Sequence, residues 1–144
     1  MRVRLFAPVV AVVCLQFAIP GTARSQAADS TRQIRVYLDC QVNGCDDVYF
    51  RREITFIDHM RDRADASVHV LVTAEPTGGA GTAYALNFIG LRELAALSDT
   101  LRFTVPNSAT PDERRTRLAK YLKLGLVRYA MRGGAAERLA VSYA

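Results

Sequence analysis

A hairpin pattern in the middle of the chain constrains the fold most strongly. Residues 68–73 are rich in β-branched side chains, and in residues 82–89 large apolar side chains alternate with smaller or polar ones. The segment from Glu75 to Gly81 between them carries a proline and several glycines, which predicts a turn. Two adjacent strands need a sheet to bury their apolar faces, so an all-helical fold is excluded.

Two further segments alternate in the same way. Residues 34–39 form a first strand with apolar side chains at every second position, and this strand ends at Cys40. Residues 99–105 alternate again, and Pro106 ends that strand. The last of these segments follows the hairpin after a connection over residues 90–98 that has some helical character, so three consecutive strands are expected to form an antiparallel meander.

Two amphipathic helices accompany these strands. We expect the first to run from Asp46 or Asp47, either of which can cap it, to about Arg63, because apolar side chains recur at helical spacing. The second begins at the sequence Thr-Pro-Asp-Glu of residues 110–113, a capping box with proline at the first helical position. It is expected to end at the glycine pair 133–134.

The predicted order is β-α-β-β-β-α, an α+β fold of the two-layer sandwich type. We expect two helices packed on one face of a three- or four-stranded mixed sheet, in a single domain over residues 34–134. Residues 135–144 are expected to form a terminal strand or the start of a following segment, because apolar side chains alternate again near the end of the sequence.

The first 27 residues have the pattern of a secretory signal peptide. Arg2 and Arg4 precede an uncharged apolar run from Leu5 to Ile19, and Ala27 ends a small-x-small cleavage pattern. The alternative is a transmembrane anchor, but the run is shorter than the ~20 residues that a spanning helix needs. We therefore expect export to the periplasm, with a flexible leader over residues 28–33. Association with the outer membrane is expected if a barrel domain follows.

The charge balance argues against nucleic acid as a partner. The formal net charge of the whole chain is +5, and removal of residues 1–27 takes away three arginines and no acid, which leaves +2. The densest remaining basic group, Arg114, Arg115 and Arg117, lies on a predicted helix and is not interleaved with aromatic residues. A nucleic-acid groove requires a clustered basic face, so none is expected.

Cys40 and Cys45 flank an Asn-Gly turn between the first strand and the first helix. In an exported protein such a pair is expected to form a structural disulfide, which stabilises a small loop by about 2 kcal/mol. The alternative is a redox pair, because a helix N-terminus stabilises a thiolate. The four intervening residues argue against it, since common redox motifs have two.

No other set of residues forms a recognised catalytic, metal or cofactor motif. Cys40, Cys45, His59 and His69 lack the spacing of metal ligands, so no metal site is expected. We place His59 on the first helix and His69 on a strand, as a half-buried side chain with satisfied hydrogen bonds. The glycines of residues 78–81 lie between two strands and predict a hairpin turn, not a phosphate-binding loop.

The export signal, the strand order and the two hairpin strands, residues 68–73 and 84–90, resemble the amino-terminal α/β domains of bacterial envelope proteins. The TolB amino-terminal domain is similar in architecture over most of residues 34–131. The resemblance is one of pattern and carries no residue-level site. It implies a domain that makes protein contacts and is not an enzyme.

We therefore predict a non-catalytic envelope domain without a cofactor, which binds an envelope protein or precedes a membrane-anchored domain. The mature chain itself is not expected to span a membrane. The first alternative is a periplasmic thiol-disulfide oxidoreductase, with Cys40 as the attacking thiol and Cys45 as its partner. The second is a small-molecule binding module built on the Glu75–Gly81 hairpin.

Overall fold

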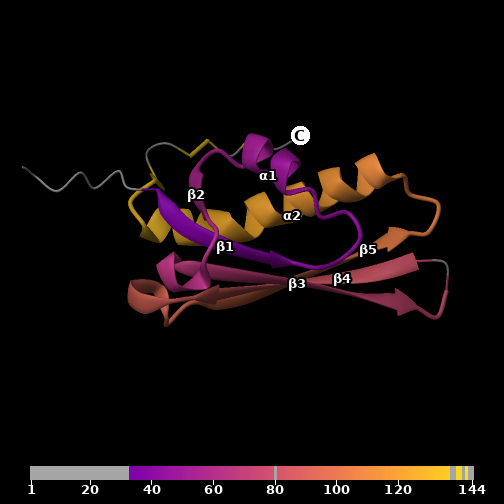
Figure 1. Cartoon of the computed structure of the whole chain (residues 1–144), viewed down its shortest axis with the longest axis horizontal. Helices are drawn as coiled ribbons and strands as arrows, with labels where there is room; N and C mark the ends of the chain where they lie inside the picture. Colours follow the sequence, from indigo (N-terminus) through magenta and orange to yellow (C-terminus); the bar gives the residue numbers. More distant parts are fainter. Residues whose placement is uncertain (1–32, 80, 137–138, 141, 143–144) are drawn as a thin grey trace, which may run out of the picture.

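The computed structural model describes residues 33–79, 81–136, 139–140 and 142. These residues form one mixed five-stranded sheet, in the order β2-β1-β3-β4-β5, and two α-helices (Figure 1). The α+β class predicted from the sequence is confirmed. The elements are β1 (Ile34–Cys40), α1 (Asp47–Glu53), β2 (Ile57–Met60), the 3₁₀ helix η1 (Arg63–Asp65), β3 (Val68–Thr77), β4 (Gly81–Gly90), the 3₁₀ helix η2 (Arg92–Leu94), β5 (Ser98–Pro106) and α2 (Pro111–Arg132).

Strand β1 lies between β2 and β3 and is parallel to both. Strands β3, β4 and β5 form the predicted antiparallel meander, with Val70 opposite Phe88 and Tyr84 opposite Phe103. The edge of β5 is partly occupied, because the Arg117 guanidinium donates to the Thr104 carbonyl oxygen at 3.2 Å. The sheet thus joins a parallel half to an antiparallel half through the β1–β3 pair.

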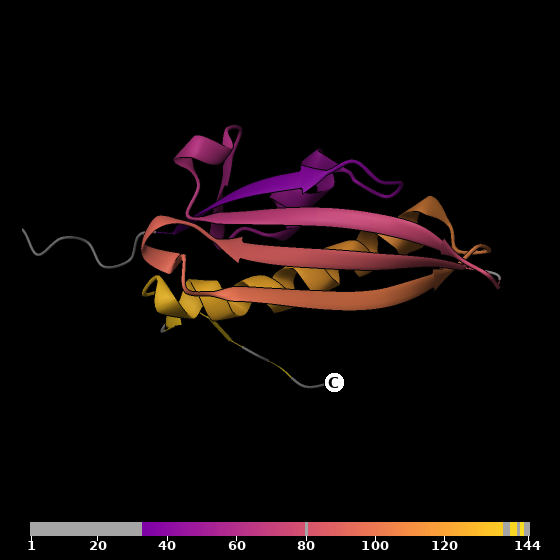
Figure 2. The same ribbon diagram turned by 90° about the horizontal axis from the view of Figure 1, so that it is seen from below.

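Both α-helices cover the same face of the sheet, as Figure 1 shows. Figure 2 shows the opposite side, where β3, β4 and β5 lie in front of α2 and no helix of the described residues covers them. The buried side chains therefore come from one face of each strand and from the inner sides of the helices. The most deeply buried include Phe50, Ile54, Val70, Leu86, Phe88, Leu118, Leu122 and Tyr129.

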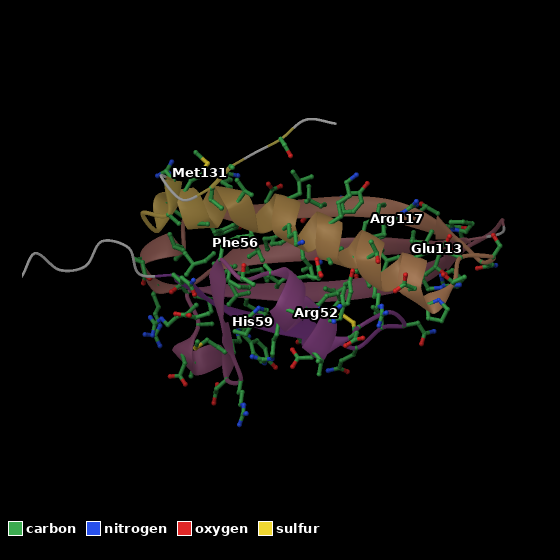
Figure 3. The ribbon with its side chains drawn as sticks, turned by 90° about the horizontal axis from the view of Figure 1, so that it is seen from above. Arg52, Phe56, His59, Glu113, Arg117 and Met131 are labelled. Carbon is green, nitrogen blue, oxygen red and sulfur yellow. A yellow bond between two sulfur atoms is a disulfide. The ribbon has the colours of Figure 1, made fainter. Side chains whose placement is uncertain are left out.

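Helix α2 begins with the predicted capping box. The Glu113 amide donates to the Thr110 hydroxyl at 3.2 Å, and the Thr110 amide donates to the Glu113 carboxylate at 2.7 Å. Near its other end the Tyr129 hydroxyl donates to the Phe88 carbonyl oxygen of β4 at 2.9 Å. Figure 3 shows Glu113 and Arg117 at the first turns of this helix and Met131 at the far end.

The first helix is shorter than the sequence predicted. Helix α1 ends at Glu53, and residues that we assigned to its continuation form the edge strand β2, with Ile57 opposite Ile34 of β1. The β-branched Ile54, Thr55 and Ile57 are weak helix formers, and the free edge of β1 offers them backbone hydrogen bonds. The sheet therefore has five strands in place of the expected three or four, and His59 lies on a strand.

Several predicted segments lie at or beyond the limits of the described residues. The signal peptide, residues 1–27, and the leader, residues 28–33, lie outside them except for Gln33. Of the predicted terminal strand, the described residues Leu139, Ala140 and Ser142 do not lie in a strand. In the described part of the chain, no helix is both long and apolar enough to cross a membrane.

Candidate functional site

The sulfur atoms of Cys40 and Cys45 are joined in a disulfide, with their Cα atoms 6.0 Å apart. The bridge connects the carboxyl end of β1 to the residue before the cap of α1. Gly44 has a φ of +99°, in the left-handed region that favours glycine, and this conformation closes the small loop. The loop thus fixes the direction in which the chain leaves the sheet and enters the helix.

This disulfide loop is held by contacts on several sides. The Tyr84 hydroxyl of β4 donates to the Asn43 carbonyl oxygen at 2.9 Å. Gly44 lies so close to α2 that an added Cβ would be 3.0 Å from Leu118 Cδ1. The Asp46 carboxylate caps α1 by accepting from the Tyr49 amide at 2.9 Å. A loop fixed by β4, α1 and α2 has the properties of a structural clamp.

Arg115 joins the start of α1 to the start of α2. Its guanidinium lies 3.0 Å from the Asp46 carboxylate and 2.7 Å from that of Asp112, and it stacks 4.7 Å from the centre of the Tyr49 ring. The pKa of Asp46 is lowered, first by the hydrogen bond from the Tyr49 amide and then by Arg115. The Arg115 pKa is raised by the two carboxylates that accept its hydrogen bonds.

A lowered Asp46 pKa predicts that this carboxylate contributes stability above its ordinary pKa of 3.8 and that the contribution is lost as the pH falls further. Replacing Asp46 by Asn keeps a good cap and removes the charge. We expect D46N to be less stable than the wild type at pH 7, and we expect its free energy of unfolding to fall less than that of the wild type as the pH is lowered below 3.8. Urea unfolding at several pH values measures this, with D47N as the control from the same turn. An unchanged pH dependence in D46N would contradict the role of the charge.

The second candidate site is the uncovered side of the sheet. Side chains alternate along each strand, so the residues between the buried ones point away from the helices. We call this surface the open face. By register, its rows are Tyr37, His69, Ile89 and Ser98; Asp39, Leu71, Asn87 and Thr100; Thr73, Ala85 and Arg102; and Glu75, Ala83 and Thr104.

His69 is the most unusual residue of the open face. It is only 6% exposed, and neither ring nitrogen has a hydrogen-bond partner in the described part of the chain. The Asp39 carboxylate lies 3.6 Å from Nε2, and the centres of the Tyr37 and His69 rings are 5.4 Å apart. The expectation of a half-buried histidine with satisfied hydrogen bonds is wrong. A buried polar group without a partner is costly, and in native structures it calls for an explanation.

A groove runs along β4 on the open face. Its volume is about 580 Å³, and the short side chains of Ala83 and Ala85 lie along it between longer ones on β3 and β5. Glu75 on β3 and Arg102 on β5 line its two sides and are both exposed. Among the described residues, neither makes an ion pair.

The structure separates the four residues that we considered as metal ligands. Cys40 and Cys45 are bonded to each other, His59 on β2 has its Nε2 3.0 Å from the Ile54 carbonyl oxygen, and His69 lies on the open face. Nowhere in residues 33–79, 81–136, 139–140 and 142 do three or more His, Cys, Asp or Glu gather in a way that could hold a metal ion.

No known protein family matches this chain, and no curated protein matches its sequence. The function must therefore be inferred from the disulfide loop and the open face themselves.

Sequence reasoning singled out the disulfide loop but missed the groove. The signal was present in residues 82–89, where Ala83 and Ala85 alternate with Tyr84, Leu86 and Phe88. That alternation shows that one side of the strand is built of small side chains. It does not show that this side is left uncovered, because the covering helices come from distant parts of the chain.

Proposed function

We propose that this protein is an exported, non-catalytic domain of the bacterial cell envelope that binds another protein through its open face. The observation that carries the proposal is the side of the sheet that no described helix covers. There the partly exposed Tyr37, Leu71 and Ile89 lie around the buried His69, whose ring nitrogens have no hydrogen-bond partner among the described residues. The signal peptide predicted for residues 1–27 and the resemblance to envelope domains support this location. The disulfide is compatible with an oxidising compartment.

The composition of the open face favours protein as the ligand. An antiparallel sheet that faces water on one side ordinarily carries polar side chains there. On this face, large side chains interrupt the polar ones: Tyr37 and Ile89 flank His69 in one row, and Leu71 lies in the next row between Asp39 and Asn87. A surface on which partly exposed apolar and aromatic side chains are mixed with polar ones is typical of a non-obligate protein interface. Covering it would remove apolar surface from water and so stabilise the complex.

The oxidoreductase alternative rests on the position of the cysteine pair before the N-terminus of α1. Both cysteines are only partly exposed and pack against the core, and the loop between them is tied to β4 and α2. A redox site must open and close its bridge, whereas these contacts favour one closed state. A reduction potential below about −300 mV is expected for the structural bridge, and a value near that of oxidising catalysts, about −120 mV, would favour catalysis.

Photocrosslinking in the producing cell tests the proposed function. The full chain is expressed with p-benzoylphenylalanine at Leu71 or Thr73 of the open face, and at Thr116 or Lys120 of α2 as controls. We expect one discrete protein adduct from the open-face positions and none from the α2 positions. Adducts confined to α2, or no adduct from any position, would overturn the proposal.

A further inference from the structure

We infer that the partner segment bound by the open face is an amphipathic α-helix that lies along β4, with a basic side chain opposite Glu75 and an acidic side chain opposite Arg102. This inference rests on the proposed function, which it deepens by naming the chemistry of the partner. It follows from three features: the main-chain hydrogen bonds of the sheet, the small and apolar side chains in and beside the groove, and the two opposed charges on its sides.

The hydrogen bonding of the sheet favours a helix over an extended segment. Strand β4 is paired along its whole length with β3 on one side and with β5 on the other. Its backbone groups are therefore already used, as the central position of β4 among the three strands in Figure 2 illustrates. An extended segment placed in the groove would find no main-chain partners for its own amides and carbonyls. A helix satisfies these groups internally and presents only side chains.

The shape and polarity of the surface fit one apolar stripe. Ala83 and Ala85 leave room for side chains of the partner at one end of the groove. At the other end the groove reaches Asn87, whose Oδ1 accepts from the Thr100 hydroxyl at 2.9 Å, and the partly exposed Leu71 and Ile89 lie beside it in the same row and in the next. A helix that runs parallel to β4 would cover both ends with residues three and four positions apart, which is the spacing of an apolar helical face.

The two charges set the pattern on the flanks of the partner helix. Glu75 lies opposite Ala83 of β4, and Arg102 lies opposite Ala85 of β4. The two charged residues are therefore on opposite sides of β4 and are offset by two residues along the strands. Two strand residues correspond to about 7 Å. On a helix, five residues advance about 7.5 Å and turn about 140°, which brings two side chains to opposite flanks. An acid and a base five positions apart therefore match both charges at once.

A display experiment tests this pairing. A library of helices with a fixed leucine stripe and randomised flanks is selected for binding to the oxidised protein, and separately to its charge-exchanged variant Glu75→Arg/Arg102→Glu. We expect the wild type to select an acid and a base five positions apart, and the variant to select the reversed pair. Each selected helix is expected to bind its matched protein about tenfold more tightly than the exchanged one, because two exposed ion pairs are reversed. The variant Lys120→Glu, with its change on α2, should select the wild-type pattern.

The outcomes separate this inference from the proposed function. Flanks without charge preference, or selected helices that bind Lys120→Glu differently from the wild type, would overturn the helix inference. Crosslinks from Leu71 and Thr73 would still support protein binding in that case. If the crosslinks fail while the library returns the expected pair, the surface accepts such helices but the proposed cellular function is wrong.

Discussion

Replacing Gly125 by alanine is expected to destabilise the domain by about 3 kcal/mol, although alanine is the better helix former. Gly125 lies on the inner side of α2, where an added Cβ would be only 2.1 Å from Phe88 Cζ and 2.3 Å from Cε2. The Phe88 ring is completely buried, and the backbone of its residue is held by the Tyr129 hydroxyl. The ring cannot swing into solvent, so α2 would have to move away from the sheet. Urea unfolding of G125A against the wild type measures the loss.

Two further variants isolate the cause. Gly78→Ala adds the same methyl group at the hairpin turn, where no atom lies within 4 Å of the new Cβ, and it should change stability little. The double variant G125A/F88L replaces the ring by a smaller apolar side chain and should recover part of the loss. If G125A is as stable as the wild type, α2 does not approach β4 as closely as described.

Removing the disulfide is expected to lower the free energy of unfolding by about 2 kcal/mol, which corresponds to the small loop that it closes. In the double variant C40S/C45S, β1 and α1 lose their covalent link, while the Tyr84 hydrogen bond to Asn43 and the Asp46 cap can still position the loop. We therefore expect a folded protein with a lower melting temperature. The measurement is urea unfolding of C40S/C45S beside the oxidised and the reduced wild type.

The reduced wild type serves as the control for this experiment, because it lacks the bridge but keeps both side chains. It should match C40S/C45S closely. A double variant as stable as the oxidised protein would show that the bridge does not clamp the loop. The open face lies on the other side of the sheet from the helices, so C40S/C45S should retain the crosslinks from Leu71 and Thr73.

The elements that sequence reasoning predicted correctly are those specified by local chemistry. The alternation of residues 82–89 and the β-branched run of residues 68–73 required strands, and the capping box at Thr110 required a helix. Each of these signals works through neighbours a few residues apart. For that reason α2, β4 and β5 could be predicted to within one or two residues. Strand β3 is longer than predicted: it continues through Thr77, into the segment assigned to the turn, because β4 pairs with it as far as Gly81.

The errors arise where a distant partner decides the structure. Residues 57–60 carry an acceptable helical pattern, but they form β2 because they pair with β1. The buried state of His69 likewise depends on Tyr37 and Asp39, which a neighbouring strand brings beside it. Neither contact is encoded in the local sequence. The disulfide loop could be predicted because its two cysteines are close together in the chain.

The two edge strands of the sheet, β2 and β5, are poorly suited to pairing with further strands. At one end β2 has only four residues, and at the other β5 terminates in Pro106 and has the Thr104 carbonyl occupied by Arg117. Short or obstructed edges suppress the edge-to-edge pairing of strands from different molecules, which leads to aggregates. The open face can therefore remain available to a partner, while the sheet edges offer few free backbone groups for uncontrolled strand pairing between molecules.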